Sequence, residues 1–151
     1  MIPFGLGAVF MIFWGMRADK SGDRVFSTAL PLAITGLSFA ATLLTDSLTV
    51  TLILLSLVLI SNFALKGPFW ALTGETLPPA VLAVGIAAVN TLGHLGTGTL
   101  NYFVGVIRHE TGSFPMALLP LAAMCFVGVI LVFYIGNRNS KTPKPQLARQ
   151  N

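Results

Sequence analysis

The chain has 151 residues, of which 54% are apolar and only 9% are charged, and its formal net charge is +4. Soluble globular domains contain about 25% charged residues, so this composition excludes an ordinary water-soluble domain. The single Cys125 excludes a disulfide framework and a thiolate metal site built from one chain. We therefore expect an integral membrane protein.

The chain opens on an apolar stretch, residues 1–14, that is short for a membrane span. A cleaved signal peptide is one explanation, but no basic region precedes the stretch and no small-residue cleavage site follows it. The other explanation is that the chain starts inside a transmembrane helix and is a fragment of a longer membrane protein. We favour the fragment.

Four later stretches contain no Asp, Glu, Lys or Arg, namely 25–45, 47–65, 80–107 and 115–136. A helix needs about 20 apolar residues to cross the hydrocarbon of a bilayer. The sequence therefore predicts an all-α, polytopic membrane helix bundle with about five transmembrane helices. The predicted spans are approximately 1–16, 25–45, 47–73, 80–107 and 115–136.

The basic residues predict the orientation of this bundle. They gather in the first loop and in the tail, 137–151, whereas the two loops between them hold only Arg108. The gathered residues are Arg17, Lys20, Arg24, Arg138, Lys141, Lys144 and Arg149. Lys and Arg favour the cytoplasmic side, so the first loop and the carboxy terminus are predicted to be cytoplasmic, in a bacterial inner membrane. We expect the basic tail to lie near anionic lipid, and we expect no nucleic-acid partner.

The spans differ in polarity. Those at 25–45 and 115–136 hold little beyond Ser and Thr, so we expect them to be scaffold that faces lipid over most of its circumference. In contrast, Asn62, Lys66 and Thr73 recur on one face of the third span. The fourth span has a similar stripe, formed by Asn90, His94, Thr97 and Asn101. Such stripes normally face a bundle interior or a water-filled path, because polar groups are costly in hydrocarbon.

Each candidate residue has two interpretations. Lys66 either extends its ammonium toward the cytoplasmic headgroups or attracts an anionic substrate into a cavity. Pro68 follows Gly67 and is expected to kink or open the helix, so Trp70 either packs or forms the wall of a pocket. His94 is either satisfied by Asn90 or a neighbouring helix, or carries protons, since imidazole titrates near physiological pH.

The first loop holds the most specific local pattern, G-x-x-x-D-K-x-G-D-R over residues 15–24. Gly15 would let two helices approach, Gly22 would permit a tight turn, and Asp19 would pair with basic groups or lie against the positive end of a neighbouring helix. The pattern resembles the cytoplasmic-loop signature of the major facilitator superfamily, in its second-half copy. That resemblance implies a gate formed by Gly15, Asp19, Gly22 and Arg24; the alternative is a short charged loop that only fixes the topology.

Three further segments strengthen the resemblance: PFWAL at 68–72, GIAAVNTLGHLG at 85–96 and TGSF at 111–114. Together they look like the anion:cation symporter family of that superfamily, which includes tartrate-, phthalate- and sugar-acid-type permeases. Four positions depart from the family pattern: Thr97 and Asn101 stand where Gly and Pro are usual, His94 where Asn is commoner, and Thr73 where Pro is usual.

The resemblance implies a partial major facilitator fold, with helices eight to twelve of a twelve-helix transporter, whose missing amino-terminal half would be the partner of this chain. It also implies alternating-access transport of a small organic anion with a proton or cation. Substrate would contact Asn62, Lys66, Trp70, Asn90, His94 and Asn101. A rival interpretation is a truncated, non-transporting membrane remnant or interaction module. We expect no enzymatic activity, no cofactor and no metal site, because no nucleophile-base pair, ligand spacing or phosphate loop occurs.

Overall fold

The computed structural model describes the backbone of residues 2–139 and the side chains of residues 3–137. Within these residues the chain forms long helices and short 3-10 turns, with no strand. The elements are α1 (Ile2–Ser21), α2 (Arg24–Ala41), η1 (Thr42–Leu44), α3 (Leu48–Thr76), η2 (Pro79–Val81), α4 (Leu82–Thr111) and α5 (Phe114–Asn139). The predicted all-α fold is confirmed.

Four helical segments are long and apolar enough to cross a membrane: Arg24–Leu44, Leu48–Thr76, Pro79–Thr111 and Phe114–Asn137. Helix α1 is not among them, because its last two turns contain Arg17, Asp19 and Lys20. It runs to Ser21, past the predicted end of the first span at 16. That residues 1–136 form a carboxy-terminal half-bundle remains a prediction.

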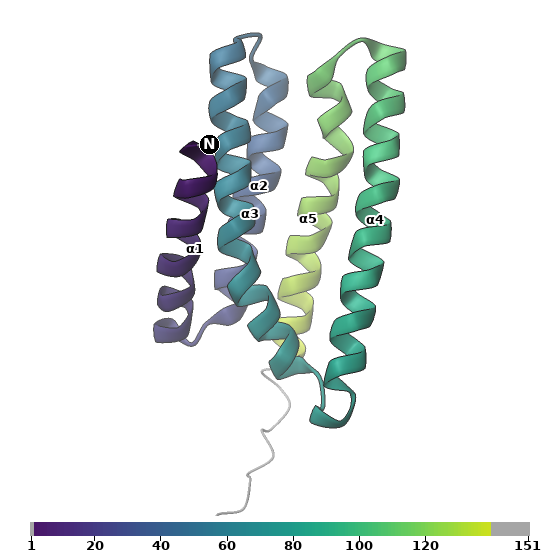
Figure 1. Ribbon diagram of the computed structural model, residues 1–151. Helices are drawn as coiled ribbons and strands as arrows, with labels where there is room; N and C mark the ends of the chain where they lie inside the picture. The colour runs from purple at the N-terminus through teal and green to yellow at the C-terminus, as the bar shows by residue number, and fades with distance from the viewer. Residues whose placement is uncertain (1, 140–151) are drawn as a thin grey trace, which may run out of the picture.

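The helices run alternately up and down (Figure 1). Helix α2 packs against α3 and α5, α1 packs on α3, and α4 packs along α5 with little contact to α3. The α1–α2 turn, the α3–α4 turn and the end of α5 lie at one end of the bundle, and the α2–α3 and α4–α5 loops lie at the other. This alternation is what the predicted topology requires. Which end faces the cytoplasm remains a prediction.

Helix α2 is the most buried of the long helices, so the prediction that it mainly faces lipid is wrong for the described bundle. Its contact residues are small: Ser27, Thr28, Ala29, Thr35 and Ser38 are each at most 4% exposed. The hydroxyls of Thr28 and Thr35 donate to backbone carbonyls one turn earlier, at 2.7 and 2.9 Å. Small residues with satisfied hydroxyls let neighbouring helices approach closely, which explains the burial.

Helix α3 continues through Pro68, which lies fully buried inside it. The helix does not open there; instead, its lower half bends away from the axis of its upper half (Figure 1). The predicted kink is present and the predicted opening is absent. The bend carries the end of α3 toward the start of α4.

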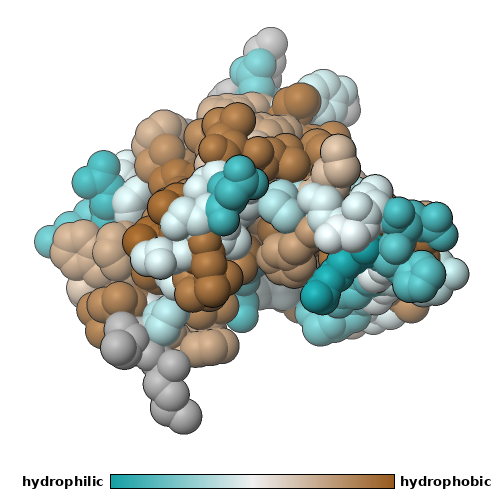
Figure 2. Space-filling model, turned by 90° about the horizontal axis from the view of Figure 1, so that it is seen from above, coloured by the Kyte–Doolittle hydropathy of each residue, from teal (hydrophilic) through white to brown (hydrophobic). Residues whose placement is uncertain are grey.

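Each of the five long helices exposes large hydrophobic side chains on the outer surface. The view along the bundle shows apolar and hydrophilic patches side by side at its upper end (Figure 2). Helix α4 has no buried residue at all among its 30 residues. A Cβ placed on Gly93, Gly96 or Gly98 would meet no atom within 4 Å. The polar stripe of α4 is therefore open along its length in the described part of the chain.

Candidate functional site

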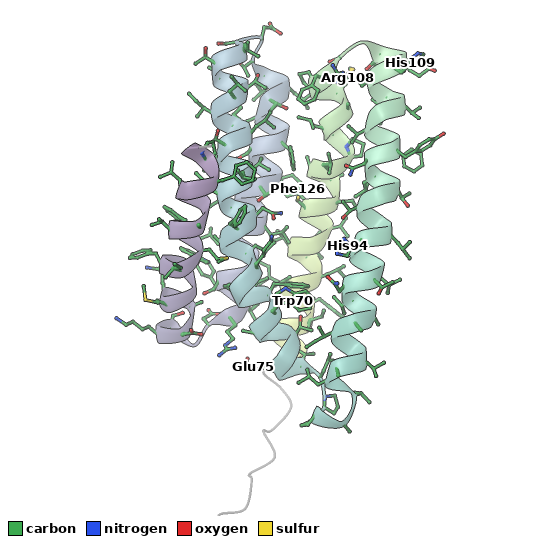
Figure 3. The ribbon with its side chains drawn as sticks, in the orientation of Figure 1. Trp70, Glu75, His94, Arg108, His109 and Phe126 are labelled. Carbon is green, nitrogen blue, oxygen red and sulfur yellow. The ribbon has the colours of Figure 1, made fainter. Side chains whose placement is uncertain are left out.

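A pocket of about 290 Å³ lies between α3 and α4, where the polar stripe of α4 faces two aromatic residues of α3. From α3 it is lined by Phe69 and Trp70, and from α4 by Val89, Asn90, Gly93, His94 and Thr97. Figure 3 shows Trp70 and His94 on the sides of α3 and α4 that face this gap. The structure thus brings together Trp70, Asn90 and His94 of the predicted site.

The polar groups of this pocket are available for a ligand. The Thr97 hydroxyl donates to the Gly93 carbonyl at 2.8 Å, which leaves its oxygen lone pairs as acceptors. The side chains of Asn90 and His94 are exposed and form no hydrogen bond to another described residue. Asn90 therefore does not satisfy His94 here. The Trp70 ring packs edge to face on Phe69, with centroids 5.2 Å apart, and forms an apolar wall.

Lys66 lies one helical turn from Trp70 on α3, outside the residues that line the pocket. Its ammonium lies 4.8 Å from the centroid of the Phe63 ring, a cation–π contact. Phe63 precedes Lys66, so the side chain points back along α3, away from Thr76 and the predicted cytoplasmic end. Asn62 is exposed one turn further in that direction.

Lys66 and His94 lie at similar depths. Lys66 precedes the end of α3 by ten residues, and His94 follows the start of α4 by twelve. At 1.5 Å per residue, they are about 15 and about 18 Å from the α3–α4 turn. Asn101 lies about 10 Å beyond His94 and lines a separate hollow on α4 with Tyr102, His109 and Glu110. The structure therefore separates Asn101 from the pocket.

The predicted gating residues do not all lie in a loop. Gly15 and Asp19 lie within α1, and only Gly22 and Asp23 separate α1 from α2. Gly22 has a φ of 66°, as a tight turn requires. The Asp23 carboxylate accepts from the Phe26 N–H at 2.9 Å and caps α2. A Cβ on Gly15 would meet nothing within 4 Å, so the predicted close approach of helices at Gly15 is wrong for the described bundle.

Arg24 joins the ends of three helices. Its guanidinium lies 3.7 Å from Asp19 of α1 and 3.3 Å from Glu75 of α3, and we call these three residues the Arg24 cluster. Glu75 was not singled out in the sequence analysis. The available signal was the position of this acidic residue at the end of a span, on the same side as the basic first loop. The Asp19 and Glu75 side chains are 73% and 56% exposed, so each ion pair contributes no more than about 1 kcal/mol. A contact this weak can break and re-form.

Comparison with known proteins finds similarity to transporters. Two proteins of Agrobacterium vitis named tartrate transporter are 30% identical over 152 residues and 34% identical over 136 residues, which is 99% and 89% of this chain. A quinolone resistance transporter of Acinetobacter baumannii is 25% identical over 134 residues, 89% of this chain. These alignments cover 33%, 31% and 31% of the three relatives, so the chain spans about a third of their length.

No family model and no solved structure matches the chain. The long apolar helices and the transporter relatives together indicate an integral membrane protein related to transporters. Among residues 2–139, no three His, Cys, Asp or Glu side chains are grouped so that they could hold a metal ion.

Proposed function

We propose that this chain is part of a secondary active transporter that moves a small organic anion across the bacterial inner membrane. In this proposal the transport is coupled to a proton or another cation and works by alternating access. The observation that carries the proposal is the pocket in which Trp70, Asn90 and His94 meet, with Lys66 one helical turn before Trp70 on α3. The tartrate transporter relatives support an anionic substrate.

Each site residue has a chemical task in the proposal. Lys66 supplies positive charge for a substrate carboxylate at a depth where water screens the interaction poorly. The amides of Asn62 and Asn90 bind carboxylate or hydroxyl groups, and Trp70 forms the wall against which the carbon skeleton packs. His94 takes up and releases a proton, which would couple transport to a pH gradient. Asn101 contacts the substrate on its way along α4, since it lies above the pocket.

The Arg24 cluster acts as a gate in the proposal. It ties α1, α2 and α3 together at the predicted cytoplasmic end, and two exposed ion pairs can break without a large cost in free energy. Rocking of this helix bundle against a second one would expose the midplane site to each side in turn. The second bundle would be the amino-terminal half of a major facilitator protein of the anion:cation symporter type, and the exposed stripe of α4 would face it.

The test is uptake by cells that express the chain in its genomic context, together with the reading frames next to it. Labelled tartrate and labelled fluoroquinolone are offered in parallel, with and without an imposed pH gradient. Accumulation of tartrate that depends on the gradient, and that disappears when the chain is deleted, is expected. If deletion of the chain changes neither flux, the rival interpretation, a non-transporting remnant, is correct. If only the fluoroquinolone flux changes, the anionic substrate class is wrong.

A further inference from the structure

Arg108 continues the polar stripe of α4 to the far end of the helix. Asn90 and Arg108 are separated by eighteen residues, which is about five turns of 3.6 residues, so they lie on the same face. His94, Thr97 and Asn101 lie between them, within about 40° of that face. Figure 3 shows Arg108 and His94 on the same side of α4, with Arg108 at the end of the helix. The stripe therefore runs from the pocket to a terminal cation.

Arg108 is exposed and forms no ion pair with any described carboxylate. Its guanidinium lies 5.6 Å from the centroid of the ring of Phe114, and Phe114 is the first residue of α5. A cation–π contact holds the side chain in place while it leaves the guanidinium N–H groups free for an anion. Hydrophilic residues gather over this end of α4 in the view along the bundle (Figure 2).

The distance from the pocket decides what Arg108 can do. It lies fourteen residues beyond His94, about 21 Å along the helix, so a small anion cannot touch both residues at once. A cation at the mouth of a polar path raises the local concentration of anions, and this effect falls as ionic strength rises. A different task for Arg108, stabilisation of the carboxyl end of α4 through the helix dipole, would affect folding but not the capture of anions.

We propose that Arg108 is an entry residue that recruits the organic anion to the outer end of the α4 stripe, before the anion reaches Trp70, Asn90 and His94. This inference rests on the proposed function and adds a second anion-recognition point to it. Arg108 sets the apparent affinity and the anion selectivity of entry. It does not take part in the transport step itself.

The experiment compares Arg108→Gln, Arg108→Lys and the control Lys20→Gln, which removes a cation from the opposite end of the bundle. The readout is the KM and the maximal rate of tartrate uptake at low and high ionic strength, at equal membrane abundance of each variant. An exposed charge pair is worth up to about 1 kcal/mol, so Arg108→Gln should raise KM roughly two- to five-fold at low salt. The maximal rate should be unchanged, and the difference should disappear at high salt. Arg108→Lys and Lys20→Gln should resemble the parent.

Two results would overturn the inference. If Arg108→Gln leaves KM unchanged at low salt, or if Lys20→Gln raises KM as much, Arg108 does not recruit the anion. If Arg108→Gln lowers only the amount of folded protein, the residue serves the helix terminus. In both cases the parent still takes up tartrate and the proposed function stands. Failure of the parent to take up any organic anion would instead overturn the proposed function and this inference together.

Discussion

Replacement of Lys66 distinguishes between two roles of its ammonium group. Either the ammonium binds the substrate, or it only extends to the lipid headgroups. The ammonium contacts the Phe63 ring at 4.8 Å, a contact worth about 0.5–1 kcal/mol at an exposed site. Loss of that contact lowers stability slightly whichever interpretation is correct, so stability cannot decide between them. When a poorly solvated substrate carboxylate loses its cation, the free energy of binding weakens by about 2–5 kcal/mol, which is more than a tenfold loss of affinity.

The assay is the KM of tartrate uptake for Lys66→Gln and Lys66→Arg at equal membrane abundance. We expect Lys66→Gln to raise KM more than about tenfold. Lys66→Arg should stay much nearer the parent, because it keeps the charge and can still stack on Phe63. Lys20→Gln is the matched control for the loss of one positive charge. The reasoning is refuted if both Lys66 variants transport like the parent, since a cation at the headgroups has no contact with substrate.

Three further predictions address topology, gating and packing. Reporter fusions at Asn139 and Gly112 should give opposite signals, because these residues lie at opposite ends of the bundle; matching signals would refute the topology. Asp19→Asn should impair transport more than Asp23→Asn, since Asp19 pairs with Arg24 whereas Asp23 caps α2, and equal uptake would show that the pattern only fixes topology. Gly36→Ala should destabilise the protein by about 1–3 kcal/mol in thermal unfolding in detergent, because its new Cβ would lie 3.0 Å from the Cβ of Cys125. Gly105→Ala, which meets no atom within 4 Å, should not destabilise it.

The existence and order of the helices could be predicted from the sequence because the stretches without charged residues are long and end abruptly at loops that contain charged residues. The burial of α2 could not be predicted in the same way. Ser, Thr, Ala and Gly are tolerated both where a helix faces lipid and where it packs on another helix, and hydropathy does not distinguish the two environments. The tertiary structure decides the matter, because Thr35 is buried and Gly36 lies against Cys125 and Phe126 of α5.

The candidate site could likewise be predicted only in part from the sequence. Helical periodicity predicts each polar stripe separately, because it depends only on positions within one helix. That Trp70 of α3 faces His94 of the α4 stripe depends on the bend at Pro68 and on the turn between α3 and α4, which are tertiary features. The pairing of Arg24 with Glu75 joins residues far apart in the chain, and no local spacing predicts it.

The central claim is that the α4 stripe lines a water-filled substrate path. A thiol-labelling measurement tests it most directly, in the genomic context and in a Cys125→Ser background that removes the only native thiol. Thr97→Cys places a thiol on the stripe, and Leu92→Cys places one on another face of α4, where Leu92 is 68% exposed. We predict that a hydrophilic maleimide labels Thr97→Cys, that tartrate slows this labelling, and that Leu92→Cys stays unlabelled in lipid. Equal labelling of both positions, or labelling of Thr97→Cys that tartrate does not affect, would contradict the account.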